Sequence, residues 1–278
     1  MHRIGHLLLG LALLAAPLCA QSFTYTVLDH PTGTELTVLG INAAGAICGS
    51  YVDGGGVRRG FVYERGLFRT VDFPSAEETT VIGVNARGDM TGTYTLAGET
   101  HAWVREDGVF RTIDFPGAVS TVARDINNRG EVVGEYEGGG TSHAFLYSGG
   151  SHTSFDVPGA EGTAAWGLND AGEIVGLYFQ EDGQIHGFLL SSGAYSTVDF
   201  PAAGFTIAAR LNDAGEIAGW YASGGVQHGF LRTKAGSFVT LDPSGSVQTR
   251  ARGINPRGHI VGWYVDADGN QHGFIAKR

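Results

Sequence analysis

The sequence is poor in cysteine, in basic residues and in helical patterning. It has two cysteines, Cys19 and Cys48, among 278 residues. The first lies in an N-terminal segment that we expect to be removed, so an internal disulfide is excluded. The 18 lysines and arginines are outnumbered by 28 aspartates and glutamates, and the formal net charge is −10. This balance argues against nucleic acid and anionic membrane surfaces as partners. Beyond the N-terminal segment, no stretch has the 3.6-residue apolar period over enough length to form a helix.

Residues 1–20 are typical of a secretory signal peptide. A positively charged start and a short apolar run lead to Leu18-Cys19-Ala20, which offers a small residue at the cleavage point. The run is too short to be a convincing membrane span. A lipid anchor on Cys19 is the alternative, and the bulky Leu18 directly before it disfavours that reading. We therefore expect residues 21–278 to form one secreted domain, either periplasmic or extracellular.

Glycine, by contrast, is abundant and recurs at fixed positions. The chain has 45 glycines, and six of them end an Asn-x-x-Gly motif that returns every 42 or 43 residues. A period this regular, with no proline-rich or charged stretch to interrupt it, indicates one continuous array of repeats. The asparagines of the motif are Asn42, Asn85, Asn127, Asn169, Asn212 and Asn255.

Each repeat has the alternation of four short strands, which we call a to d. In the fourth copy we expect them at residues 163–168, 173–178, 186–190 and 195–200. The Asn-x-x-Gly motif between strands a and b favours a type I turn, with glycine where a positive φ is needed. Two-residue connections between strands c and d favour type I′ turns, whose twist suits a hairpin. These connections are Arg65-Gly66, Asp107-Gly108, Gly149-Gly150 and Ser192-Gly193.

Six copies of a four-stranded unit predict an all-β fold, a six-bladed β-propeller with antiparallel blades. A flat row of such sheets would leave edges open to aggregation, whereas a ring closes on itself. The chain starts with an orphan strand of type d, Phe23 to Asp29, and its last copy, Thr249 to Ile275, lacks that strand. We therefore expect the N-terminal strand to complete the sixth blade and close the ring. A β-solenoid is the alternative, less suited because its coils usually repeat over fewer residues.

One further motif gives a resemblance to a known family. His143-Ala144-Phe145, with the segment 126–134 before it, resembles the bacterial extracellular HAF repeat, which is named for His-Ala-Phe. The resemblance covers Phe23 to Ile275 and includes several motifs in fixed order. It implies an exported, propeller-like repeat protein, and it brings no established activity or catalytic residues. The first copy departs from the pattern, because Arg59 replaces the histidine.

The recurring histidines each begin strand c, and an aspartate recurs near the end of strand d. Counted outward from the Asp107-Gly108 turn, His101 and Asp114 face each other, which predicts a structural cross-strand pair in each blade. A metal ion shared between blades is excluded, because neighbouring histidines would lie about 15 Å apart whereas zinc ligands lie ~2 Å from the ion. We therefore predict no metal and no cofactor. The pairs are His101 with Asp114, His143 with Asp156, His186 with Asp199, His228 with Asp242, and His272 with Asp29.

A second metal-like string is Asp266-Ala-Asp-Gly-Asn270, which resembles the start of a calcium loop. It lacks the later bidentate carboxylate of such loops. Because Asp, Gly and Asn also make good turns, a plain turn between strands b and c is the interpretation that we favour.

Positions on strand a where the copies disagree are the best candidates for function, because packing alone would keep the copies alike. Three residues before the turn asparagine, three copies have a small or aliphatic residue and the others have arginine or tryptophan. Strand a lines the channel of a propeller, so these side chains are expected to converge near its mouth. There they could hold a carboxylated or sugar-like ligand, or pair with one another and plug the channel. The candidates are Arg124, Asp125, Trp166, Arg210, Arg250 and Arg252.

We expect a non-catalytic, exported binding or scaffold module for a glycan or a secreted protein, acting as a monomer. A polysaccharide-active hydrolase or lyase with its site at the channel mouth is one alternative. A glycosidase needs two carboxylates about 5 to 10 Å apart, and Asp125 is the only non-recurrent acidic candidate in the channel. No nucleophile triad, phosphate loop or dinucleotide motif occurs in the sequence. A cell-surface structural or adhesion component is the third hypothesis, and it would need sorting sequence that we do not see near Lys277-Arg278.

Overall fold

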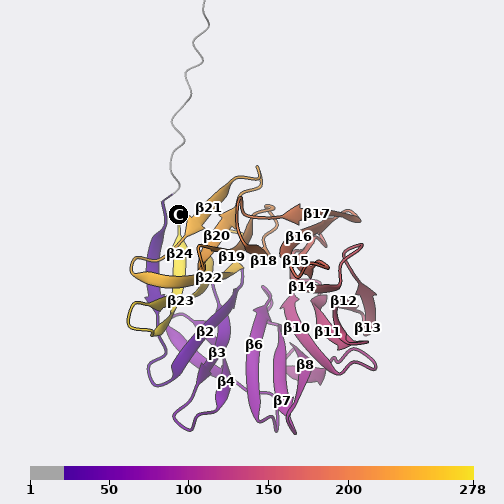
Figure 1. Ribbon diagram of the computed structural model, residues 1–278. Coiled ribbons are helices and arrows are strands. Elements are labelled where there is room, and N and C mark those ends of the chain that lie inside the picture. The colour runs from indigo at the N-terminus through magenta and orange to yellow at the C-terminus, as the bar shows by residue number, and fades with distance from the viewer. Residues whose placement is uncertain (1–21) are drawn as a thin grey trace, which may run out of the picture.

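The computed structural model describes residues 22–278, and the predicted signal peptide lies outside them. Within these residues the chain forms six four-stranded antiparallel sheets set around a central axis (Figure 1). The chain is a six-bladed β-propeller, as the repeat predicted. In the described residues no helix is long and apolar enough to cross a membrane.

In each blade the four strands are hydrogen-bonded in the order a, b, c, d, and the six a strands contact one another in a closed ring around the axis. The first blade has β2 (Thr34–Ile41), β3 (Ile47–Val52), β4 (Arg58–Glu64) and β5 (Leu67–Val71), and the second has β6 (Glu78–Val84), β7 (Met90–Leu96), β8 (Glu99–Glu106) and β9 (Val109–Thr112). The third has β10 (Ser120–Ile126), β11 (Val132–Gly138), β12 (Thr141–Ser148) and β13 (Ser151–Phe155), and the fourth has β14 (Gly162–Leu168), β15 (Ile174–Phe179), β16 (Ile185–Ser191) and β17 (Ala194–Val198). The fifth has β18 (Phe205–Leu211), β19 (Ile217–Ser223), β20 (Val226–Arg232) and β21 (Phe238–Leu241), and the sixth has β22 (Ser246–Ile254), β23 (Ile260–Asp266), β24 (Gln271–Lys277) and β1 (Thr24–Leu28).

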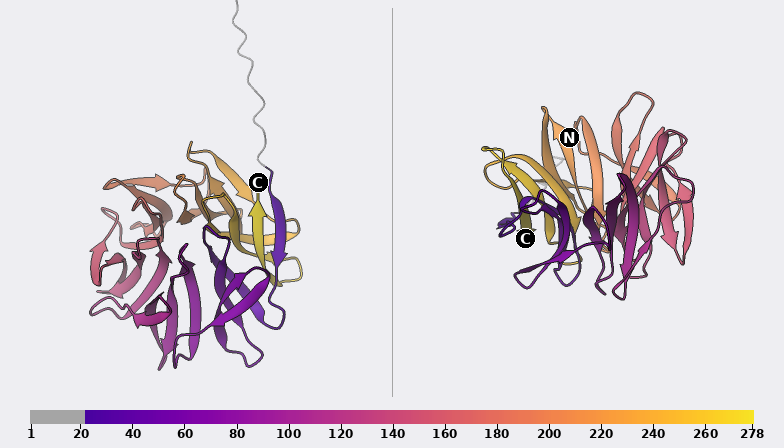
Figure 2. Two further views of the ribbon diagram at one scale, coloured as in Figure 1. Left: turned by 180° about the vertical axis from the view of Figure 1, so that it is seen from behind. Right: turned by 90° about the horizontal axis from the view of Figure 1, so that it is seen from below.

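Strand β1 closes the ring. It pairs antiparallel with β24, from Thr24 opposite Lys277 to Leu28 opposite Gly273. Figures 1 and 2 show this indigo strand beside the yellow C-terminal strand from opposite sides. Leu28 is buried, and the ring of Tyr25 meets the edge of Phe274 at a centroid distance of 5.9 Å. The prediction that the N-terminal strand completes the sixth blade is confirmed.

The turns have the geometry that their residues predicted. In the first Asn-x-x-Gly turn the amide of Gly45 donates to the carbonyl of Asn42 at 3.0 Å, and Gly45 has a φ of 94°. The same bond and a positive φ recur in the other five copies. Between strands c and d, Arg65 and Gly66 have φ values of 53° and 83°, as a type I′ turn requires.

Packing between blades is built on the third residue of the His-Ala-Phe motif. This aromatic ring is buried in every blade, as Phe61, Trp103, Phe145, Phe188, Phe230 and Phe274. Burying one such ring contributes about 1.5–3 kcal/mol to folding. A glycine on strand b makes the space: a Cβ on Gly134 would lie 1.9 Å from the carbonyl oxygen of Val122 and 2.8 Å from Cε1 of Phe145. The glycine that recurs at this position of strand b is therefore a packing requirement of the blade.

Candidate functional site

A closed ring of asparagines surrounds one end of the channel, which we call the Asn side; the opposite end, where strands b join strands c, is the loop side. The side-chain amide of each turn asparagine donates to the main-chain carbonyl of the turn asparagine in the next blade, at 2.9–3.4 Å. The last of these bonds runs from Asn255 to Asn42 and completes the circle. The sequence predicted these residues as turn formers, and their second role in linking the blades was not foreseen.

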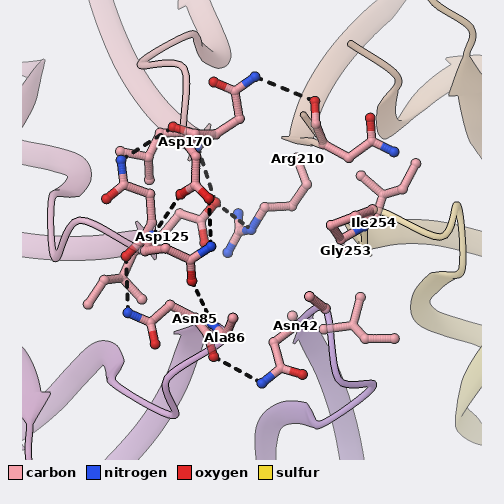
Figure 3. A pocket seen from close by; sticks show the side chains of 18 of the residues that line it. Asn42, Asn85, Ala86, Asp125, Asp170, Arg210, Gly253 and Ile254 are labelled. Atoms are coloured by element: carbon pink, nitrogen blue, oxygen red, sulfur yellow. Dashed lines mark hydrogen bonds and ion pairs between the residues drawn. The ribbon is translucent and has the colours of Figure 1, made fainter. Parts of the chain in front are cut away.

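The pocket inside this ring has a volume of about 90 Å³, and Arg210 and Asp125 lie against it (Figure 3). Arg210 Nε lies 3.3 Å from Asp125 Oδ2. The guanidinium also donates to the carbonyls of Ile82 and Ala209 at 3.0 Å each, and to those of Trp166 and Arg124. Burial raises the pKa of the Asp125 carboxyl, and the charge of Arg210 opposes this effect. Because its donors are already occupied by four different blades, Arg210 acts as a plug that ties the inner strands together.

The other predicted channel residues owe their position to a β-bulge in each inner strand. Between Ala123 and Asp125 the register of β10 against β11 shifts by one residue, and every other inner strand has the same shift. A bulge leaves one residue unpaired and re-aims its side chain. The unpaired residues are Leu39, Ile82, Arg124, Trp166, Ala209 and Arg252, which is the variable position that the sequence had singled out.

Three of these bulge residues meet although they come from different blades. The guanidinium carbon of Arg124 lies 4.3 Å from the centroid of the Trp166 ring, and that of Arg252 lies 4.5 Å from it. Arg252 belongs to the sixth blade and Trp166 to the fourth, so they meet past the fifth blade, whose bulge residue is the small Ala209. The contact therefore joins two blades that are not neighbours in the ring.

Two tryptophans on strand b extend this contact into a larger group, which we call the Arg–Trp cluster. Arg252 also lies over Trp220 at 4.9 Å, and Arg250 lies over Trp220 at 5.3 Å and over Trp263 at 4.8 Å. Both tryptophans occupy a position that is Ser50, Thr93, Glu135 or Leu177 in the other blades. The cluster consists of Arg124, Trp166, Trp220, Arg250, Arg252 and Trp263.

The arginines of the cluster differ in how their charge is balanced. Both carboxylate oxygens of Glu135 accept from Nε of Arg124, at 2.9 and 3.0 Å. Nε of Arg250 donates to the side-chain oxygen of Gln227 at 2.6 Å. Within residues 22–278 the guanidinium of Arg252 has neither a hydrogen-bond acceptor nor an acidic partner, and 7% of the residue is exposed. Its positive charge is met by aromatic faces alone.

A larger pocket opens on the loop side of the third blade, next to the cluster. Its volume is about 310 Å³, and Glu135, the partner of Arg124, is part of its wall. On the other flank of the cluster, partly buried Phe179, Ile185 and Phe205 pack with Trp166 and Trp220. The pocket is lined by Ser120, Val122, Glu135, Tyr136, Glu137, Gly140, Thr141 and Ser142.

The predicted histidine–aspartate pairs all form. The distances from Nδ1 to the carboxylate are 2.6 Å for His101, 2.8 Å for His143, 2.7 Å for His186 and His228, and 2.9 Å for His272. Each imidazole also stacks on a tyrosine of strand b, as His101 does on Tyr94 at 4.9 Å. In the first blade Arg59 takes the place of histidine and binds Asp53 at 2.9 Å and Asp72 at 3.1 Å.

Metal ligands do not cluster among the residues that the structure describes, where no group of three or more histidines, cysteines or acids could hold an ion. In the calcium-like string, Oδ1 of Asp266 accepts the amides of Asp268 at 2.9 Å and Asn270 at 2.8 Å. That carboxylate therefore stabilises the turn in which it lies.

The pair at His272 gives a testable pH dependence. Its Nδ1 lies 2.9 Å from Asp29 and its Nε2 lies 3.2 Å from Asp266, so both nitrogens face carboxylates. Asp29 first, and then Asp266, raise the pKa of His272. Hydrogen bonds from Asn270, and then the one from His272, lower the pKa of Asp266 to about 2. Stability from a raised pKa is complete below the unfolded value of about 6.5 and is lost as the pH rises through the folded value.

We therefore expect His272→Phe, which keeps a ring against Tyr264, to lower the melting temperature more at pH 5.5 than at pH 9. Thermal unfolding of both proteins at the two pH values measures the difference. An equal loss at both would show that His272 is not charged in the folded protein.

The comparison with family models found no match, and neither did the comparison with curated proteins. Among solved structures, the chain is similar to the β-propeller domain of the trilobed protease of Pyrococcus furiosus, with 8% identity, 88% of this chain and 97% of that chain covered, and a TM-score of 0.57. It is similar to Aleuria aurantia lectin, a variant of which was solved with Fucα1-6GlcNAc, with 10% identity, 88% and 93% covered, and a TM-score of 0.56. It is also similar to virginiamycin B lyase from Staphylococcus aureus, with 11% identity, 92% and 100% covered, and a TM-score of 0.51.

Identities this low show the fold alone, and propellers host unrelated functions. The resemblance to the HAF repeat stays a prediction. In the channel the carboxylates of Asp125 and Glu135 are each paired with an arginine. The remaining charged and aromatic groups there are those of the Arg–Trp cluster.

Proposed function

We propose that the protein is an exported, non-catalytic binding module whose ligand is a glycan held on the loop side of the channel. The observation that carries this proposal is the Arg–Trp cluster, which breaks the six-fold repeat and adjoins a polar pocket. The other blades fold with different residues at these positions, so the fold itself does not require the guanidinium and indole groups gathered here.

The two parts of the site suit the two sides of a sugar. The face of a pyranose ring carries C–H groups that pack on an aromatic ring, and Trp166, Phe179 and Phe205 are partly exposed there. Its edge carries hydroxyls, which need both donors and acceptors. The neighbouring pocket offers the hydroxyls of Ser120 and Thr141 and the carboxylate of Glu137, among others. Pockets of about 300 Å³ or more are the size in which small ligands bind.

The similarity to Aleuria aurantia lectin supports a glycan as the first class to test, because that propeller was solved with a fucosylated disaccharide. Export is supported by the signal-like residues 1–20 and by the resemblance to an extracellular repeat.

A glycan screen followed by titration calorimetry with the best hit tests the proposal. We expect Trp166→Ala to weaken binding by about tenfold, since one aromatic or cation–π contact is worth roughly 1 kcal/mol or more. Arg257→Ala is the matched control: its side chain is exposed on the Asn side, where Nη2 donates to the carbonyl of Ala43 at 2.7 Å, and it should not change the affinity.

Two outcomes would overturn the proposal. If no glycan binds, the ligand is of another class. If binding survives Trp166→Ala but disappears when the exposed loop residues 180–184 and 267–270 are altered, the site lies on the outer loops and the Arg–Trp cluster is only a plug.

A further inference from the structure

Arg252 is a largely buried cation that has no anionic partner among residues 22–278. Only 7% of the residue is exposed, and within residues 22–278 its guanidinium makes no hydrogen bond or ion pair, although its nitrogens still reach solvent. Burying a cation without a partner is costly, and cation–π contacts of about 0.5–2 kcal/mol offset only part of that cost. A second unpaired donor, the buried Nε1 of Trp166, lies in the same cluster.

The two tryptophans that contact Arg252 lie on the same side of its guanidinium. Its guanidinium carbon lies 4.5 Å from the centroid of Trp166 and 4.9 Å from that of Trp220, and the two centroids are 5.3 Å apart. Three such distances form a nearly equilateral triangle, so the two indoles lie on the same side of the guanidinium. They therefore do not enclose it between them.

The surrounding charge is positive although the protein is acidic overall. Of the four arginines near the axis, Arg124 is neutralised by Glu135 and Arg210 by Asp125, which leaves Arg250 and Arg252 without an acid. Burial first, and then repulsion from Arg124, Arg210 and Arg250, lowers the pKa of Arg252 well below its usual value. A negatively charged ligand would offset both the cost of burying the Arg252 charge and the repulsion from the neighbouring arginines.

We propose that Arg252 binds the carboxylate of an acidic saccharide, a uronic acid, with Trp166 and Trp220 supporting the guanidinium from behind. This inference rests on the proposed glycan-binding function and deepens it by naming the charged group. A planar carboxylate matches the fork of N–H donors at the edge of a guanidinium, which can bind both of its oxygens. A sulfate ester presents the same charge to the same donors, and the experiment separates the two.

The binding test compares three ligands that differ in one group: an oligogalacturonate, its methyl ester, and a sulfated oligosaccharide. By titration calorimetry the wild-type protein should prefer the oligogalacturonate to the ester by roughly tenfold or more, as for a charged hydrogen bond. Arg252→Gln should abolish this preference, whereas the control Arg257→Ala on the Asn side should keep it. Stronger binding of the sulfated ligand would replace the uronic acid with a sulfate ester and overturn the assignment of a carboxylate. Equal binding of acid and ester by the wild-type protein would refute the inference while the proposed function stands.

A second measurement works without a glycan and keeps the inference testable if none binds. In the ligand-free protein, Arg252→Met should raise the melting temperature, because it replaces an unpaired buried charge with an apolar side chain of similar length. Citrate or inorganic sulfate should raise the melting temperature of the wild-type protein and have a smaller effect on the variant. A lower melting temperature for Arg252→Met would show that the guanidinium is a structural plug. Equal stabilisation of both proteins by the anions would show that they act elsewhere.

Discussion

A variant that lacks residues 22–31 is expected to lose the closed monomeric ring, and to melt ~10 °C or more below the intact protein or to oligomerise. The deletion removes all five register pairs between β1 and β24 and the buried side chain of Leu28. It also leaves β24 as an exposed edge, and an open strand edge invites pairing with another chain. Thermal unfolding and size-exclusion chromatography with light scattering measure the two outcomes.

Two controls separate closure from the general loss of ten residues. Val27→Ser changes an exposed side chain of the same strand, 51% exposed, and should have little effect on stability. A synthetic peptide of residues 22–31, added to the deleted protein, should pair with β24 and recover part of the melting temperature. A deleted protein that stays monomeric with an unchanged melting temperature would show that β1 is dispensable to the ring.

The architecture was predictable because turn chemistry repeats in the sequence. Asparagine and glycine mark each turn by their backbone preferences, and the spacing between them leaves room for short strands alone. In the fourth copy the predicted strands 163–168 and 173–178 match β14 (Gly162–Leu168) and β15 (Ile174–Phe179) to within one residue. The missing last strand and the orphan first strand predicted closure for the same reason: every hydrogen-bonding edge needs a partner.

The details of the candidate site were less predictable, because they depend on backbone offsets that leave no mark in composition. The bulges at Arg124, Trp166 and Arg252 lie inside a strand with ordinary alternation, and only the register shows them. The predicted site residues all came from positions on strand a where the copies differ, so the prediction did not include Trp220 and Trp263 on strand b. The same comparison extended to strand b would have found both. The separation of Arg210 from the other arginines, on the Asn side, follows from its neighbouring position one residue after the bulge.

The asparagine ring gives the second prediction of a large effect, and it concerns a single residue. Asn255 is fully buried: its Oδ1 accepts the amides of Arg257 and His259 at 3.0 Å each, and its Nδ2 donates to the carbonyl of Asn42 at 3.2 Å. Asn255→Ala would leave the amides of Arg257 and His259 without their acceptor. It would also remove the bond between the last blade and the first, after which the carbonyl of Asn42 would accept from Gly45 alone. Because each buried unsatisfied group costs about 1–3 kcal/mol, we expect a loss of ~3 kcal/mol or more in the free energy of unfolding.

Asn255→Asp tests the contacts within the turn separately. The carboxylate keeps the two acceptor contacts within the turn but cannot donate to the carbonyl of Asn42, and it places a buried charge against that carbonyl, so this variant should lose at least about 1–3 kcal/mol. Asn128→Ala is the matched control, because Asn128 is exposed and lies next to the ring without belonging to it. Urea unfolding of the three variants gives the free energies. If Asn255→Ala costs no more than Asn128→Ala, the ring of asparagines is a consequence of blade packing. If Asn255→Asp is less damaging than Asn255→Ala in spite of its buried charge, the acceptor contacts within the turn carry most of the stabilisation.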